Sequence, residues 1–203
     1  MTIGVVSEQL LCALVEARAR GFLGPGLVED HIRHAAAFAP LLSSCGPFLD
    51  LGSGGGVPGL VLAALLPTSR WTLLDANDRR VGFLRETVSD LGWPGRVVPV
   101  RARAEDYGHT EARGSYAAVV SRGFASPAAT AECAAPLLRT GGVLVVSEPP
   151  EERPRWDPVG LGTLGLRLGA RTVAPGLQVL HQESTCPDRF SRRNGVPTKR
   201  PLF

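Results

Sequence analysis

The chain has 203 residues, of which 44% are hydrophobic and 20% are charged, with a formal net charge of +3 at pH 7. These values exclude the disordered and fibrous classes of protein and allow one substantial hydrophobic core. The four cysteines lie far apart and form no CxxC pair, so a zinc site or a disulfide framework is not expected. No apolar run approaches the roughly 20 residues that a bilayer span needs, and we expect a cytoplasmic protein that neither crosses a membrane nor binds a metal.

Two helical segments are predicted at the start of the chain. Apolar residues recur at helical spacing over residues 10–15 and again over 27–42, and the glycine-rich stretch 21–26 separates them as a loop. We therefore expect an N-terminal helical extension over residues 1–45, followed by a larger domain over 46–203.

From residue 46 onward, short apolar runs alternate with segments of helix length. Continuous apolar runs are typical of strands buried on both faces, and the alternation predicts a parallel sheet covered by helices. The expected strands are FLDL at 48–51, WTLLD at 71–75, VVPV at 97–100, YAAVVS at 116–121, VLVVS at 143–147 and LQVLHQES at 177–184. Helices are expected over 58–66 and 78–91, and another from Ser126 until the pair Gly141-Gly142 ends it. The stretch 148–158 is rich in proline and charge, which predicts a surface loop.

The stretch FLDLGSGGGVPGL follows the first expected strand and opens a helix. Ligands bind at the carboxyl ends of such strands, and glycines let a ligand approach the backbone. Gly54, Gly56 and Gly59 satisfy the G-x-G-x-x-G pattern of dinucleotide sites, and Asp75 lies at about the 20-residue distance at which an acid meets ribose. A lone match of this kind is a weak signal.

A second pattern in the same stretch, D-x-G-x-G-x-G, is formed by Asp50, Gly52, Gly54 and Gly56. An acid at the end of the strand would repel a pyrophosphate, but it suits a ligand that carries an ammonium and a sulfonium. We therefore favour S-adenosylmethionine over a dinucleotide. The alternative is that Asp50 and Asp75 only cap helices and that the glycines only make a turn.

Two further acids fit a nucleoside ligand. Asp75 ends the strand WTLLD, where its carboxylate can accept hydrogen bonds from both ribose hydroxyls. Glu105, in the stretch VRARAED after the third expected strand, is well placed to line the adenine region, although a solvated loop acid is an equal alternative.

Five segments in order resemble the successive motifs of the glucose-inhibited division protein B family, the bacterial 16S ribosomal RNA guanine-N7 methyltransferases. These segments are FLDLGSGGGVPGL, TLLDANDRRVGFLRE, RARAEDYG, VVSRGFAS and SRRNGVPTKRPL. The resemblance implies a class I S-adenosylmethionine-dependent methyltransferase (Rossmann-like) fold over 46–203. Such a fold is a mostly parallel seven-stranded sheet with helices on both faces and its last strand antiparallel. The resemblance also implies contacts with S-adenosylmethionine at Gly52, Val57, Ala104, Glu105 and Arg122.

The chemistry of this family explains why no catalytic triad is evident. Guanine N7 carries an in-plane lone pair and no proton, so it can attack the sulfonium methyl without a general base, and the enzyme has only to position the reactants. Arg103 and Arg122, at the expected ends of strands, are our candidates for that role. The basic tail supplies Arg192, Arg193, Lys199 and Arg200 as candidate RNA contacts. The expected partner is 16S ribosomal RNA or the small ribosomal subunit, and we expect a monomer.

One position departs from the family pattern, and another matches it. Family members usually carry a lysine after the fifth strand, where this chain reads VVSEPPEE and places Glu148. His34 matches the family motif, and a lone histidine on an alanine-rich helix is expected to be a structural hydrogen-bonding residue. The alternatives are a diverged methyltransferase acting on a small molecule or another RNA, and a non-catalytic relative that binds S-adenosylmethionine or RNA.

Overall fold

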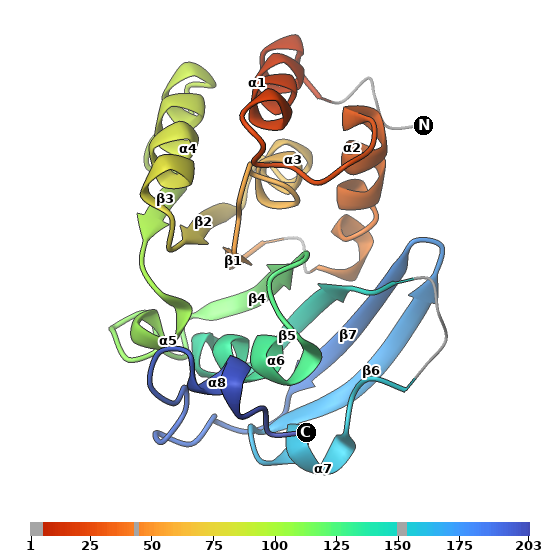
Figure 1. The fold of residues 1–203 in the computed structure, drawn as a ribbon, viewed down its shortest axis with the longest axis vertical. Helices are drawn as coiled ribbons and strands as arrows, with labels where there is room; N and C mark the ends of the chain where they lie inside the picture. Colours follow the sequence, from red (N-terminus) through yellow and green to blue (C-terminus); the bar gives the residue numbers. More distant parts are fainter. Residues whose placement is uncertain (1–5, 43–44, 150–153) are drawn as a thin grey trace.

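A seven-stranded sheet organises the chain in the computed structural model, which describes residues 6–42, 45–149 and 154–203 (Figure 1). The strands are β1 Pro47–Leu51, β2 Arg70–Asp75, β3 Val97–Arg101, β4 Tyr116–Ser121, β5 Leu138–Ser147, β6 Leu166–Val173 and β7 Gly176–Gln182. Their order in the sheet is β3-β2-β1-β4-β5-β7-β6. β1 to β5 pair in parallel, and β7 is antiparallel to both of its neighbours. The structure confirms the predicted mostly parallel sheet with an antiparallel last strand.

Helices cover both faces of the sheet (Figure 1). They are α1 Glu8–Ala19, α2 Val28–Ala36, α3 Gly59–Leu65, α4 Asp78–Asp90, α5 Ala104–Tyr107, α6 Pro127–Ala134, α7 Pro158–Gly162 and α8 Val196–Lys199. One hydrophobic cluster joins α1 to α4 to one face, and a second joins α5, α6 and α7 to the other. Every residue of β4 is buried, as the continuous apolar run YAAVVS predicts for a central strand.

The N-terminal extension packs directly on this sheet. Leu10 and Leu14 of α1 and Ile32 of α2 belong to the same hydrophobic cluster as Phe48 of β1. The expected boundary at residue 45 therefore lies within one continuous core, and the extension contributes to the wall of the site described below. Among the described residues, no helix is both long and apolar enough to cross a membrane.

Three local predictions are corrected by the structure. The helix α6 ends at Ala134, and the pair Gly141-Gly142 lies inside β5 instead of ending a helix. The pairing of β4 with β5 shifts register at this point, and Gly141 has a φ of +80°, so the glycines form a bulge in the strand. β6 is not predicted by its own pattern, because it lies at the edge of the sheet and only one of its eight residues is buried.

The third correction is partial: the described residues of the expected surface loop 148–158 form a loop up to Asp157, but not all of them are exposed. Residues 150–153 lie outside the described part of the chain, but Glu148 and Trp156 on either side of them are both buried. Trp156 donates a hydrogen bond to Glu148, so both side chains can be buried. The composition of the segment, rich in proline and charge, gives no sign of this pairing.

Candidate functional site

Three cavities lie side by side at the carboxyl ends of the central strands. We name them after one lining residue each: the Asp75 cavity of about 270 Å³, the Val57 cavity of about 260 Å³ and the Glu148 cavity of about 440 Å³. Gly123, in the turn after β4, lines all three. A Cβ atom at Gly123 would meet no heavy atom within 4 Å, so the space at this junction is open. The arrangement suits two ligands that meet at one point.

The glycine loop forms one wall of the Val57 cavity. Gly52, Gly54 and Val57 line it, together with Leu23 and Gly24 from the loop between α1 and α2. The two loops are tied together, since the Gly55 N–H donates to the Phe22 carbonyl at 3.1 Å. The sequence prediction missed this contribution of the N-terminal extension, because no local signal links the two segments.

Gly56 has a different role from its neighbours in the loop. A Cβ atom there would lie 2.3 Å from Leu60 Cδ1, so this glycine allows the loop to pack onto α3. Its φ of +92° also favours glycine. Gly56 therefore shapes the loop from the core side, whereas Gly52 and Gly54 face the cavity.

Asp50 lies beneath the glycine loop and is fully buried. Its Oδ2 accepts a hydrogen bond from the Gly59 N–H at 2.9 Å, whereas its Oδ1 has no hydrogen-bond partner among the described residues. Burial raises the pKa of this carboxyl to about 7, and the neighbouring charge of Asp75 acts in the same direction. Asp50 is not among the residues that line the three cavities, so it can act on a ligand through its charge and through the loop that it holds.

Several predicted residues converge in the Asp75 cavity. Asp75, Arg103, Ala104 and Glu105 all line it, as does Gly52 from the glycine loop. The carboxylate of Asp75 is oriented by the backbone, because Oδ2 accepts from the Gly54 N–H at 2.9 Å. These residues come from three strand ends, and the parallel sheet brings them together as the sequence predicted.

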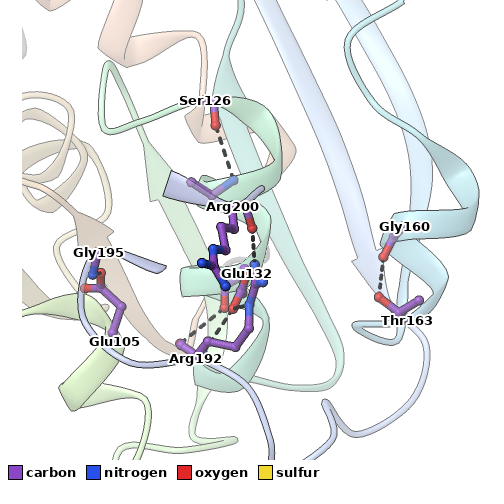
Figure 2. Close-up of polar contacts among 10 residues, drawn as sticks. Glu105, Ser126, Glu132, Gly160, Thr163, Arg192, Gly195 and Arg200 are labelled. Carbon is purple, nitrogen blue, oxygen red and sulfur yellow. Dashed lines mark hydrogen bonds and ion pairs between the residues drawn. The ribbon is translucent and has the colours of Figure 1, made fainter. Parts of the chain in front are cut away.

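The C-terminal segment closes one side of the Asp75 cavity. Glu105 Oε1 accepts a hydrogen bond from the Gly195 N–H at 2.9 Å (Figure 2), and Thr198 contributes to the cavity lining. The tail, which the sequence predicts as a source of RNA contacts, thus also forms part of this cavity.

Arg122 lines both the Val57 cavity and the Glu148 cavity. Its Nη2 hydrogen-bonds to His31 Nδ1, and His31 Nε2 lies 3.1 Å from the Gly24 carbonyl oxygen. Because a carbonyl can only accept, Nε2 carries the proton and the neutral Nδ1 accepts from the arginine. Burial, reinforced by the charge of Arg122, lowers the pKa of His31 and favours this neutral form.

One donor of Arg122 remains unsatisfied. Its Nη1 is buried and has no hydrogen-bond partner within the part of the chain that the structure describes. Burial also lowers the pKa of this guanidinium, while Asp50 opposes the shift. A buried donor without a partner at the junction of the cavities is available for an acceptor atom of a ligand.

Hydrogen-bonded side chains line and support the Glu148 cavity. The side chain of Glu148 is only 3% exposed, and it accepts from Trp156 Nε1 at 3.2 Å and from Arg155 Nη1 at 3.2 Å. Ser147 Oγ lies 2.9 Å from His34 Nε2. Burial, and then the charge of Arg122, lower the pKa of His34 to about 4, so it is neutral at pH 7 and acts as a hydrogen-bonding residue.

The four predicted RNA contacts of the tail fall into two groups. Arg192 is bound to Glu132, which is fully buried in α6: its backbone N–H donates at 3.0 Å, its Nε at 2.8 Å and its Nη2 at 2.6 Å (Figure 2). Arg193, Lys199 and Arg200 are exposed. Arg192 is therefore an anchor of the tail, and the other three are available for a phosphate backbone.

Within the described ranges, no three His, Cys, Asp or Glu side chains come together in a way that could hold a metal ion. The polar groups of the three cavities are instead single carboxylates, arginines and backbone amides. Such groups suit an organic ligand with hydroxyl, amino and carboxyl functions.

Comparison with known proteins gives a consistent result. Residues 24–149 match the family model described as rRNA small subunit methyltransferase G. The chain is 40% identical over 168 residues to the Ribosomal RNA small subunit methyltransferase G of Deinococcus radiodurans, in an alignment that covers 76% of this chain and 65% of that protein. It is 35% identical over 190 residues to the protein of the same name from Rubrobacter xylanophilus, which covers 85% and 72% of the two chains. The chain thus spans slightly less than two thirds of the first relative and more of the second.

Solved structures resemble the whole fold at low sequence identity. The cofactor-bound structure of Rv0187 from MTB superposes with a TM-score of 0.62 at 19% identity and covers 90% of this chain and 94% of that one. A protein from Corynebacterium glutamicum gives a TM-score of 0.60 at 20% identity, over 85% and 90% of the two chains. Together with the family model, these similarities confirm the predicted class I methyltransferase fold.

Proposed function

The chain belongs to the rRNA small subunit methyltransferase G family, and we propose that it uses S-adenosylmethionine to methylate guanine N7 in 16S ribosomal RNA. The observation that carries the proposal is the junction at Gly123, where the two cavities lined by the predicted cofactor residues meet a third cavity. The proposed partner is 16S RNA or the small ribosomal subunit, in the cytoplasm, with the enzyme acting as a monomer.

The residues of the first two cavities fit this cofactor. In the Asp75 cavity, Asp75 would accept hydrogen bonds from the ribose hydroxyls, and Ala104 and Glu105 would border the adenine. In the Val57 cavity, Gly52 and Gly54 present bare backbone, and Arg122 offers its unsatisfied Nη1 to a carboxylate. Asp50 beneath the loop would stabilise the positive charges of the ligand.

The proposed reaction needs positioning more than proton transfer. When bound, S-adenosylmethionine supplies a sulfonium methyl group that the N7 lone pair can take directly. The N7 atom has no proton to lose, so the neutral His31 and His34 need not act as bases. In this proposal His31 orients Arg122, and Arg103 contributes from the lining of the Asp75 cavity.

The test is transfer of labelled methyl from S-adenosylmethionine to small-subunit ribosomal RNA or particles, followed by nucleoside analysis. We expect N7-methylguanosine from the wild type and a rate about 100- to 1000-fold lower for Arg122→Ala, as for removal of a preorganised donor. Arg139→Ala is the matched control, because Arg139 is an exposed arginine at the start of β5, whereas the site lies at the carboxyl ends of the parallel strands.

The outcomes separate the alternatives. Binding of S-adenosylmethionine without labelling of any RNA would leave the fold and the cofactor intact and exclude the RNA substrate. Labelling at a different atom or base would contradict the N7 assignment. Equal activity of Arg122→Ala and the wild type would remove Arg122 from the site.

A further inference from the structure

The Glu148 cavity has no assigned ligand after the cofactor is placed. It is larger than either of its neighbours, at about 440 Å³, and it shares Arg122 and Gly123 with the Val57 cavity. Its remaining walls come from the end of β5, from the start of α6 and from the segment before α7. A molecule in this cavity would therefore lie next to the transferable methyl group.

The chemistry of this cavity is unusual for a protein that binds a polyanion. The carboxylate of Glu148 is almost completely buried in its wall, with one hydrogen bond to each oxygen from Trp156 and Arg155. A carboxylate has about four acceptor positions, so it can accept two more hydrogen bonds. Arg155 and Arg122 also line this cavity, so the carboxylate is ion-paired, and its two open acceptor positions suit a group with N–H donors.

We propose that the Glu148 cavity receives the target base and that Glu148 recognises the N1–H and 2-amino group of guanine. This inference rests on the proposed function. Among the four standard RNA bases, only guanine places two N–H donors on adjacent atoms in the way that a carboxylate accepts them. Adenine and cytosine pair an amino group with an acceptor, and uracil has a single N–H between two carbonyl oxygens.

The proposed contact also sets the orientation of the base. N7 lies on the opposite edge of the purine from the 2-amino group. With the Watson–Crick edge at Glu148, N7 points away from this carboxylate, and the inference requires it to face Gly123, which the cavity shares with the cofactor cavities. A base extruded from an RNA stack is typically held between aromatic or apolar side chains, and Phe124 and Trp156 line this cavity.

Charge gives a second reason for an acid at this position. Methyl transfer to N7 moves the positive charge from sulfur to the purine ring, which also makes N1–H a stronger donor. A carboxylate that accepts from N1–H stabilises this developing charge more than it stabilises the neutral base. An acid in place of the lysine that the family pattern predicts is therefore compatible with the reaction.

The competing explanation is that Glu148 only holds Trp156 and Arg155 in place. The two explanations differ in their dependence on the substrate. A purely structural role makes a Glu148 variant worse toward every base, whereas recognition changes the ratio between bases that differ by one donor.

The experiment uses the full chain and small-subunit RNA assembled with guanosine or inosine at the position that the wild type methylates. Inosine keeps N7 and N1–H but lacks the 2-amino group. We expect the wild type to prefer guanosine over inosine by about 5- to 150-fold in kcat/KM, the range for a bidentate base contact. Glu148→Gln should lose most of this preference. Glu148→Asp, which retains the carboxylate, serves as a second variant, and Glu183→Gln, an exposed glutamate after β7, is the control that should keep the wild-type ratio.

The outcomes distinguish this inference from the proposed function. Equal use of guanosine and inosine by the wild type would overturn the role of Glu148 and leave the methyltransferase activity standing. An unchanged ratio in Glu148→Gln would do the same. Failure of the wild type to methylate any RNA would overturn the proposed function first, and the inference with it.

Discussion

Among the described residues, Asp50 and Glu132 are both fully buried carboxyl groups, and their surroundings differ. Glu132 in α6 is saturated by Arg192, which donates three hydrogen bonds from its guanidinium and its backbone. Asp50 at the end of β1 receives one backbone hydrogen bond from Gly59 on Oδ2 and leaves Oδ1 without a partner among the described residues. One acid is paired by the fold, and the other is left incompletely paired.

This difference distinguishes a buried acid that stabilises the fold from one that is suited to act on a ligand. A saturated buried charge holds two segments together, and here it anchors the C-terminal tail to α6. An incompletely satisfied buried charge raises the free energy of the unliganded protein, and it lies beneath the proposed cofactor loop. A buried carboxyl group thus has opposite consequences in helix α6 and in strand β1, and each consequence can be tested.

The largest expected effect is loss of the partner of Glu132. Arg192→Ala leaves a fully buried carboxylate with only the backbone N–H of residue 192, and we expect it to lower the free energy of unfolding by about 3–5 kcal/mol. Arg193→Ala, at the neighbouring exposed arginine, should change it by less than about 0.5 kcal/mol. Denaturant unfolding of both variants measures the difference.

Equal stability of the two variants would mean that Glu132 is not held by Arg192 in solution. Arg192 would then return to the group of RNA contacts. Because the tail also lines the Asp75 cavity, a destabilised tail should weaken S-adenosylmethionine binding in Arg192→Ala and not in Arg193→Ala.

A smaller effect is expected from Asp50, whose titration should make S-adenosylmethionine binding depend on pH. Its pKa of about 7 in the unliganded protein lies above its ordinary value, so stability that is present at low pH is lost as the pH rises toward 7. A cationic ligand favours the ionised carboxylate. We therefore expect the dissociation constant of S-adenosylmethionine to be about tenfold higher at pH 6 than at pH 8, measured by titration calorimetry.

Asp50→Asn provides the comparison, because it keeps an acceptor for Gly59 and removes the charge. The ratio of its dissociation constants at pH 6 and pH 8 should be about tenfold smaller than that of the wild type. Any titration of the ligand itself is common to both proteins and cancels in this comparison. Asp75 and Arg122 are the charged groups whose fields act on Asp50, with opposite signs, and both remain in the variant. A wild-type pH profile that coincides with that of Asp50→Asn would show that the ligand charge does not reach Asp50.

The two acids also show how far the sequence could be interpreted. Asp50, Gly52 and Gly54 lie within one short stretch, so spacing along the chain was enough to predict a ligand loop at the end of a strand. Glu132 and Arg192 are 60 residues apart, and no local pattern links them. The pairing depends on how the C-terminal segment packs on α6, which is a property of the whole fold.

The same distinction applies to the rest of the site. Arg122 was predicted from the motif after β4, but His31, which orients it, is 91 residues away. Glu148 was noted only as a departure from the family pattern, and its burial against Trp156 became visible in the structure alone. Likewise β6 has no strong pattern of its own because edge strands bury few side chains, and only the resemblance predicted a seventh strand.

The smallest expected effect concerns the exposed cations of the tail. If Arg192 is an anchor, phosphate binding falls to Arg193, Lys199 and Arg200, which are exposed around it. Each phosphate contact to single-stranded RNA contributes about 0.7 to the slope of log affinity against log salt. Lys199→Ala should therefore reduce the slope by about 0.7 and weaken binding about threefold more at 50 mM salt than at 200 mM. Filter binding of a small-subunit RNA fragment across this salt range measures both quantities.

The slope distinguishes a phosphate contact from a change in the fold. Loss of the Glu132 anchor lowers affinity through stability, whereas loss of a phosphate contact lowers it through counterion release. An unchanged slope in Lys199→Ala would place the RNA on another face of the protein.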